Sequence, residues 1–266
     1  MAYKKMGFLF FKINYGTRIH LFFLLFLGFQ STAQTEKENQ FTNEYQFNRV
    51  IGTKTAIEFN LAHAYTSGIN ETNPFYKSSQ ISGRLWMHYY TLKKWKLSGF
   101  VAYLYNRDVP EITQKKSSEI RFAAQAIYYF IKKDYVLTNR IRIEDRILEQ
   151  SNASLEVVFR FREMVKLIYP ISIVKFGKGS LYSISSEEVV FKTNGSTTGE
   201  DAFDRNRLTL GLGYSFSDAF QFELTYMNEY LPRNTNDKMY NSISTTIIFN
   251  DLISVLRKKN GIIPTY

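Results

Sequence analysis

The sequence predicts an all-β fold, an antiparallel transmembrane β-barrel of ten or twelve strands, and three observations lead to it. Segments of strand length alternate charged and apolar residues, most clearly from Arg140 to Ile147, which reads RIRIEDRI. On a strand, such a segment has one charged face and one apolar face. Aromatic residues make up 17% of the chain, as the interfacial girdles of a membrane barrel require. A secretory leader precedes this pattern, so the apolar faces are expected to contact lipid and the charged faces to line the lumen.

Residues 1–33 have the organisation of a signal peptide. Residues 1–18 contain four basic side chains and no acidic one, residues 19–29 are an apolar run, and residues 31–33 are Ser-Thr-Ala. This order matches a basic region, an apolar region and a small-residue cleavage site. The apolar run is too short to span a bilayer as a helix. We therefore expect cleavage after Ala33, export through this leader and localisation in the outer membrane of a Gram-negative cell. An uncleaved signal anchor is the alternative.

Eleven segments of the remaining chain have strand character, and most are long enough to cross a bilayer at a tilt. They cover residues 43–49, 55–66, 79–90, 96–105, 118–131, 135–149, 154–169, 180–191, 205–214, 220–230 and 240–249. We expect a polar N-terminal segment over 34–42, a barrel domain over 43–250 and a periplasmic tail over 251–266. Because bacterial barrels have even strand numbers, either 34–42 contains a twelfth strand or 43–49 is not a full strand and ten remain.

The apolar faces of these segments are expected to contact lipid, since a slip of one residue would bring charges into the bilayer. They run from Ile57 to Tyr65, Ile120 to Phe130, Leu155 to Phe161, Leu208 to Tyr214, Phe222 to Tyr226 and Ile243 to Phe249.

The connections between the segments alternate in length, which is a second sign of a barrel, although Gln150–Ala153 is short in a long slot and Pro170–Gly179 is longer than a tight turn. Short connections fall at Val50–Lys54, Thr91–Trp95, Lys132–Asp134 and Ser215–Ala219. Long connections fall at Ser67–Ser78, Asn106–Ser117, Lys192–Asp204 and Leu231–Met239. We expect the short connections to be periplasmic turns and the long ones to be external loops.

The charged faces form the one polar constellation with real specificity, a lumen network of arginine and glutamate. A barrel of ten or twelve strands has a narrow lumen, so charges inside it must pair or bind water and ions. Two interpretations follow: a structural plug of salt bridges, or a narrow passive pore that favours small anionic solutes. The candidate residues are Arg121, Arg140, Arg142, Glu144, Arg146, Glu156, Arg160, Arg162, Glu188, Arg205 and Arg207.

Several short motifs resemble the family called domain of unknown function 2490. They are an R.E.R strand, an R.R strand, a strand with one glutamate and an R.R...G strand, in that order. In this sequence they fall at Arg142, Glu144 and Arg146; Arg160 and Arg162; Glu187 or Glu188; and Arg205, Arg207 and Gly211. The resemblance implies a barrel in the outer membrane of a bacterium of the Bacteroidetes group, which the Ala-Gln cleavage junction also fits. The family has no established activity, so the resemblance implies fold and location only.

We expect no enzyme activity, and hence no catalytic residue, cofactor or metal ligand. A Ser–His–acid site needs a histidine near a serine, and beyond the leader the chain has only His63 and His88. Because side chains alternate between the two faces of a strand, His63 is expected on the lipid face, whereas His88 is expected on the lumen face together with Trp86. The sequence contains no G-x-S-x-G elbow and no cysteine, which leaves weak grounds for a hydrolase or zinc site.

We therefore expect a structural role or that of a narrow passive pore, with outer-membrane lipids and a small anionic solute as partners. A membrane-embedded hydrolase is the enzyme alternative. A soluble secreted β-sandwich is the second, but its strands average only about five or six residues. Nucleic acid is not an expected partner despite the net charge of +10, because the basic residues lie beside acidic ones and form no stripe. The sequence does not determine the oligomeric state.

Overall fold

The computed structural model describes residues 35–68, 71–91, 94–109, 114–132, 135–150, 152–171, 179–195, 201–233 and 236–251. The expected signal peptide and all of the expected tail except Asp251 lie outside the described residues. Within the described ranges, no helix has the length and apolar character needed to cross a membrane.

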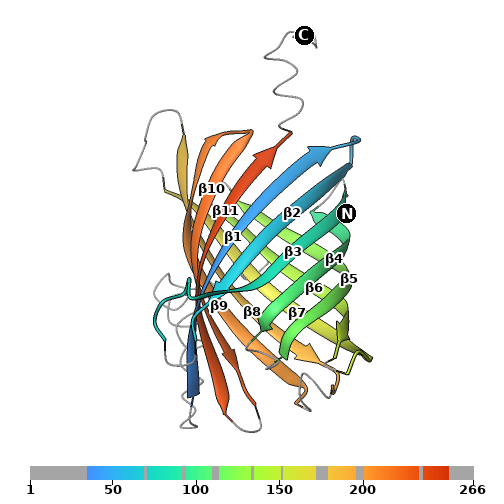
Figure 1. Cartoon of the computed structure of the whole chain (residues 1–266). Helices are drawn as coiled ribbons and strands as arrows, with labels where there is room; N and C mark the ends of the chain where they lie inside the picture. The colour runs from blue at the N-terminus through green and yellow to red at the C-terminus, as the bar shows by residue number, and fades with distance from the viewer. Residues whose placement is uncertain are drawn as a thin grey trace, which may run out of the picture. The chain divides into compact units, whose positions relative to one another are not determined.

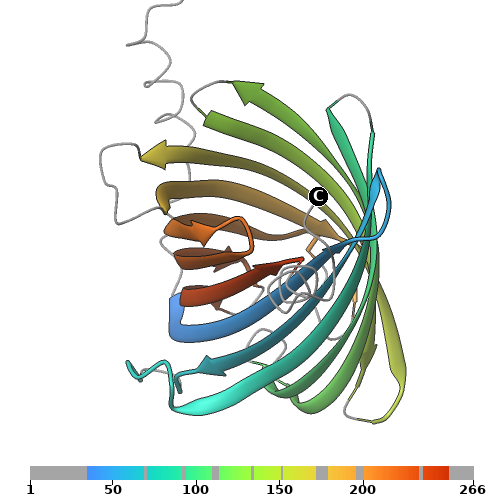
Figure 2. The ribbon, with the colours of Figure 1, turned by 90° about the horizontal axis from the view of Figure 1, so that it is seen from above.

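The described chain forms one closed β-barrel of eleven strands (Figures 1 and 2). The strands are β1 (Thr35–Val50), β2 (Thr55–Thr66), β3 (Lys77–Tyr90), β4 (Trp95–Val109), β5 (Gln114–Lys132), β6 (Tyr135–Glu149), β7 (Leu155–Ile171), β8 (Ser180–Lys192), β9 (Phe203–Ser217), β10 (Phe220–Leu231) and β11 (Asp237–Asn250). Each strand pairs antiparallel with its neighbours in sequence, and the order around the barrel follows the chain. The all-β barrel predicted from the sequence is confirmed.

The strand number corrects the expectation of ten or twelve. Residues 34–42 are neither a separate polar segment nor an extra strand, because residues 35–42 form the first half of β1. The barrel closes by a parallel pairing of β1 with β11, from Thr35 opposite Asp237 to Asn48 opposite Asn250, and Figure 1 shows the two strands side by side. An odd number of alternating strands places the first and last in the same direction. The expectation failed because it took even parity as a rule.

Burial alternates along the strands as the sequence pattern predicts. On β6, Ile143 is 60% exposed, whereas Arg142 and Glu144 on either side of it are 8% and 1% exposed. The same holds for Phe159 on β7, which is 52% exposed between buried Val158 and Arg160. Apolar side chains therefore dominate the outside of the barrel and the arginines project inward. On β6 and β7 the outer face also carries Asp145 and Glu163.

The connections differ in part from the expected alternation. At one end of the barrel, β1 is followed by β2, β3 by β4, β5 by β6, β7 by β8 and β9 by β10; at the other end, each even-numbered strand is followed by the next odd-numbered one. The expected long loop over Asn106–Ser117 is wrong, because β4 continues to Val109 and β5 starts at Gln114. The first end, which holds the turn between β9 and β10 and the end of β11, is called the short-turn end below.

The inner face is not uniform around the barrel. On β3, β4 and β5 it carries a small apolar cluster of Trp86, Phe100, Ala102 and Leu104, with Ala123 packed against it. The rings of Trp86 and Phe100 lie 4.3 Å apart between centroids. Most of the arginine–carboxylate pairs lie instead on β5 to β10, although Arg84 of β3 also pairs with Glu44 of β1. One wall of the interior is thus rich in arginine, and the facing wall is mostly apolar or small.

Candidate functional site

The centre of the charged wall is a set of ion pairs on β6, β7 and β8. Arg162 donates from Nη1 to Oε2 of Glu144 (3.0 Å) and from Nη2 to Oε2 of Glu188 (2.8 Å). Arg140 also donates to Glu188. Inward positions on neighbouring strands lie opposite one another in register, so the alternation that sends Arg142 inward also sends Arg162 inward beside it. Carboxylates shared between such arginines hold the three strands together from the inside.

A second group of ion pairs joins β5 to β6. Glu119 is 1% exposed and receives Nε of Arg121 at 2.5 Å. Arg146, which lies on the adjacent strand, donates to the same carboxylate through Nε and through Nη2, the latter at 2.9 Å. One buried carboxylate thus compensates two guanidinium groups.

A third group depends on a β-bulge in β9. Val190 pairs with Arg205 and Phe191 pairs with Phe203, so Asp204 is the extra residue and turns inward together with Arg205. The Asp204 carboxylate lies 2.9 Å from Nη2 of Arg160, 2.8 Å from Nε of Arg205 and 3.3 Å from Nη2 of Arg233. The bulge therefore delivers a fully buried carboxylate to a site where three arginines converge.

The last group continues onto β10 through Glu229, which is 2% exposed. Its Oε1 receives Nη1 of Arg205 at 2.8 Å, and its Oε2 receives Nε of Arg207. Arg207 also reaches Oε2 of Glu188 with Nη1 at 3.3 Å, which links this group to the central one.

The structure brings most of the candidate network residues into these ion pairs. They are Arg121, Arg140, Arg142, Glu144, Arg146, Arg160, Arg162, Glu188, Arg205 and Arg207. Glu156 lies near the start of β7, where it accepts a hydrogen bond from Nε2 of Gln150 at 2.9 Å. Of the two glutamates that the motif left open, Glu188 faces inward to the arginines, whereas Glu187 accepts a hydrogen bond from Asn206.

The candidate list omitted four members of the network. Glu119 and Glu229 share the parity of inward residues on their strands, so extending the alternation along β5 and β10 would have found them. Asp204 has the opposite parity to Arg205, and only the bulge turns it inward. Arg233 lies in the connection after β10, where strand periodicity gives no signal.

Between the two walls lies a cavity of about 200 Å³. Among the described residues that line it, the small or apolar ones come from β2 and β4 and include Ala62, Ala64 and Ala102. Facing them are the charged lining residues Arg121, Arg142, Glu144, Arg162 and Arg207, whereas Glu44 and Arg84 lie beside β2, on β1 and β3. Within the described part of the chain, the lining as a whole thus carries five arginines and two glutamates. The cavity has room for a few waters or one small oxyanion.

Arg142 is the least compensated arginine of this cavity. Its Nε and Nη2 both donate to the neutral Oε1 of Gln125, at 3.0 and 2.8 Å. Its closest carboxylate contact is Glu144, at 3.9 Å, the outer limit of an ion pair. The guanidinium lies over the rings of Trp86 and Phe100, 5.0 and 5.5 Å from their centroids. Ring faces stabilise a cation, but they leave its net charge in place.

Both histidines in the described residues, His63 and His88, contact serines. His63 Nε2 lies 2.8 Å from Oγ of Ser78, and its ring packs beside Tyr65. His88, which is 4% exposed, has Nδ1 2.9 Å from Oγ of Ser98 and Nε2 3.1 Å from Oε2 of Glu58. Within the described ranges, no three His, Cys, Asp or Glu side chains gather as metal ligands would.

Fold and site together define a closed β-barrel with buried arginine–carboxylate pairs on one inner wall. The chain belongs to the family described as "Protein of unknown function (DUF2490)", whose model matches residues 39–240. The resemblance seen in the motifs is thereby confirmed.

No curated protein matches this chain. Among solved structures, it is similar to the beta domain of the Bordetella autotransporter Brka, at 9% sequence identity. The alignment covers 71% of this chain and 82% of that one, with a TM-score of 0.41. A likeness at this level says nothing about the role of this chain, which therefore has to be argued from its own side chains.

Proposed function

We propose that this chain is exported through its leader and spans an outer membrane as a β-barrel, with lipid around its apolar outer face. The support comes from the outside of the barrel, where large apolar side chains such as Leu85, Phe122, Ile143 and Leu212 stand exposed on strand after strand. A water-soluble protein rarely exposes an apolar surface of this extent. In a bilayer, a closed barrel also leaves no unpaired strand edge.

Within that barrel we propose a narrow passive conduit for small anions. The observation that carries this is Arg142 on the cavity wall, whose nearest carboxylate is 3.9 Å away, whereas each of the other four lining arginines has a carboxylate oxygen within 3.3 Å. Buried charge without a close partner is costly, so an anion that entered the cavity would stabilise this guanidinium. Arg142 would be its main ligand, because that guanidinium has two hydrogen bonds to a neutral amide and only a distant carboxylate.

The test is single-channel recording of the refolded chain without its leader in a planar bilayer, under a gradient of potassium chloride. We expect small, steady current steps whose reversal potential is shifted from zero toward the equilibrium potential of chloride. Arg142→Gln should move the reversal potential toward zero, whereas Arg49→Gln, on an exposed residue near the end of β1, should leave it unchanged.

Two results would contradict the conduit. One is silence from protein that runs as a folded, heat-modifiable barrel on a gel, which would leave the ion pairs as a structural plug. The other is a cation-selective current, since it would mean that the arginines do not set the potential along the path.

A further inference from the structure

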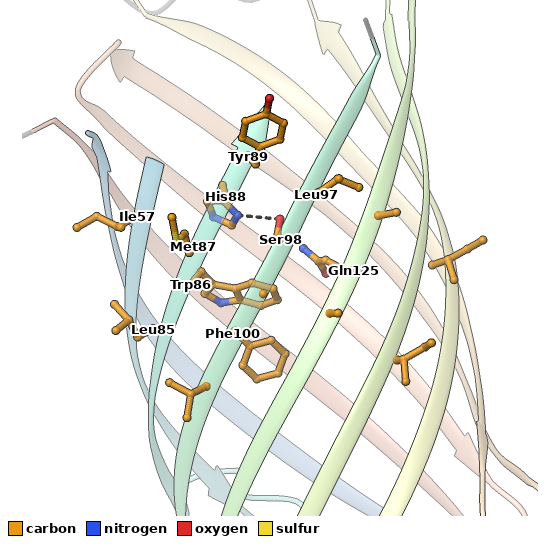
Figure 3. Close-up of a pocket in the computed structure, with 16 residues that line it drawn as sticks. Ile57, Leu85, Trp86, Met87, His88, Tyr89, Leu97, Ser98, Phe100 and Gln125 are labelled. Carbon is orange, nitrogen blue, oxygen red and sulfur yellow. Dashed lines mark hydrogen bonds between the residues drawn. The ribbon is translucent and has the colours of Figure 1, made fainter. Parts of the chain in front are cut away.

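A polar row crosses the inner face of the barrel close to the short-turn end. His88 on β3 is the direct cross-strand partner of Ser98 on β4, and Ser98 in turn is the partner of Gln125 on β5. Glu58 on β2 completes a hydrogen-bonded chain, Glu58 Oε2 to His88 Nε2 at 3.1 Å and His88 Nδ1 to Ser98 Oγ at 2.9 Å. Figure 3 shows the His88–Ser98 hydrogen bond with Trp86 and Phe100 farther along the same strands. An acid, a histidine and a serine are thus connected in the order that activates a serine hydroxyl.

The roles of the two ring nitrogens follow from their partners. A carboxylate can only accept a hydrogen bond, so Nε2 of His88 carries the proton that it donates to Glu58. Nδ1 is then the basic nitrogen, and it accepts the hydroxyl proton of Ser98. Glu58 fixes this tautomer and the ring orientation, which makes it a positioning residue.

Gln125 supplies a hydrogen-bond donor beside Ser98. Its Oε1 is engaged by Nε and Nη2 of Arg142, so its amide nitrogen must point away from that guanidinium. In Figure 3 this nitrogen lies on the side of Gln125 that faces Ser98. Arg142 is itself held over Trp86 and Phe100. A donor oriented in this way, next to a nucleophile, can stabilise the oxyanion of an acyl-transfer intermediate.

The row lies close to the short-turn end of the barrel, which is the nearer end for a small molecule that enters the lumen. His88 lies two positions before the end of β3 at Tyr90, and Ser98 lies three positions after the start of β4 at Trp95. The next inward pair toward that end is Tyr90 with Lys96, and Tyr90 is 42% exposed. Trp86 and Phe100 offer an apolar surface on the other side of the row.

We propose that Ser98 is the nucleophile of a hydrolytic site for small carboxylic esters with an apolar acyl group, with His88 as its general base. This goes beyond the conduit and does not rest on it. It also departs from the sequence-based expectation of no enzyme activity, because only the strand register places Ser98 and Glu58 on the two sides of His88.

In the first step, Ser98 Oγ forms a bond to the ester carbonyl carbon and its proton passes to Nδ1 of His88. The carbon–oxygen bond to the alcohol then breaks, and the alcohol leaves with that proton. In the second step, water adds to the acyl carbon and gives a proton to Nδ1. The bond to Ser98 breaks, Ser98 recovers its proton, and the carboxylic acid is released.

The first experiment is covalent labelling of the refolded barrel with a fluorophosphonate probe, which reacts with activated serines. We expect Ser98→Ala to abolish labelling and His88→Asn to slow it by about 100-fold or more, the usual contribution of a general base. The control is Ser78→Ala, because Ser78 also contacts a histidine but no carboxylate hydrogen-bonds to His63 in the described residues. That variant should label at the wild-type rate.

The second experiment is turnover of 4-nitrophenyl butyrate by the same samples, each checked for a heat-modifiable barrel band. Glu58→Gln should lower kcat while KM and the temperature at which the folded band is lost stay unchanged, as expected for a residue that orients His88.

The assignment is wrong if folded wild-type barrel takes no label, or if folded Ser98→Ala is labelled like wild type. Labelling that is lost equally in Ser78→Ala would overturn it as well. Chloride conduction is measured separately, so a silent channel with a labelled Ser98 would contradict the conduit alone.

Discussion

Ile143 and Arg142 are consecutive residues on β6, yet they lie on opposite surfaces of the barrel. The outer one has only apolar cross-strand partners, Ala124 and Phe161, and in a bilayer it would face hydrocarbon. The inner one sits among carboxylates, an amide and two rings. This contrast makes the two faces testable by single substitutions.

We predict that Ile143→Arg or Leu212→Arg strongly reduces barrel assembly, because arginine on the lipid face costs about 2–4 kcal/mol near the bilayer midplane. Thr138→Arg, on the inner face of the same strand as Ile143, should assemble far better. The measurement is the yield of heat-modifiable barrel in membrane fractions. Equal yields for the three variants would contradict the assignment of faces.

Gly213 has a packing reason for lacking a side chain. It lies opposite Tyr182 of β8, and a Cβ at Gly213 would fall 2.2 Å from the Tyr182 ring. That tyrosine is held in place by its hydroxyl, which donates to Glu223 on β10 at 2.9 Å. A glycine within a strand often marks such a close approach of a neighbouring group.

Gly213→Ala should therefore destabilise the barrel by about 1–3 kcal/mol, the usual cost of overpacking. Gly99→Ala is the matched control, since its Cβ would approach nothing closer than 3.7 Å. The readout is the temperature at which the folded gel band is lost. A drop for Gly99→Ala as large as that for Gly213→Ala would show that any loss of a strand glycine has this effect.

At the scale of elements, the least expected feature is the parallel seam between β1 and β11. Side chains cross it at both faces: Thr245 Oγ1 donates to Asn43 Oδ1 (3.0 Å), and Asn48 Nδ2 donates to Asn250 Oδ1 (2.8 Å). From the first contact to the second, the residue number increases on both strands, which only a parallel pairing allows.

The chain has no cysteine, so the seam can be tested by paired cysteines without background. We predict that Asn43→Cys with Thr245→Cys, and separately Asn48→Cys with Asn250→Cys, each form a disulfide on mild oxidation of the folded barrel. Asn43→Cys with Thr246→Cys should not, because a shift of one residue turns the second cysteine to the other face. A crosslink in only one of the two matched pairs would contradict the parallel register.

Element boundaries were harder to predict than element faces. Strand β4 extends to Val109 and β5 starts at Gln114, through residues that sequence analysis placed in a loop. The pairs Asp108 with Lys115 and Val109 with Gln114 continue the ladder there. Polar residues at the end of a strand give no apolar alternation, so only the pairing with a neighbouring strand defines where it ends.

For the whole molecule, the odd number of strands means that β1 begins at one end of the barrel and β11 finishes at the other. β1 begins opposite the short-turn end, and β11 finishes at the short-turn end. In a membrane, the longer connections are expected outside and the short turns in the periplasm.

We predict that an epitope inserted between Asn194 and Gly195 binds antibody on intact cells, whereas one inserted between Asp218 and Ala219 binds only after the outer membrane is permeabilised. Labelling of both after permeabilisation is the control that each insertion is tolerated. Surface labelling of the second epitope alone would reverse the proposed orientation.

Much of the candidate site could be predicted because alternation is a local property. Arg140, Arg142 and Arg162 were assigned to the interior from parity alone, and the structure places them there. Asp204 could not be found, because its bulge exists only where β8 and β9 pair out of step. Glu58, His88 and Ser98 could not be joined either, since the register of three strands brings them together.

The sequence by itself determined the all-β class, the inner and outer faces and the arginine-rich character of the interior. These follow from the period of two in a strand, which any stretch of chain carries without reference to the rest. The tertiary structure decided the number of strands, the parallel closure, the partners of each carboxylate and the row from Glu58 to Gln125. Each of these depends on which residues of distant strands stand opposite one another, and that register is set only when the barrel closes.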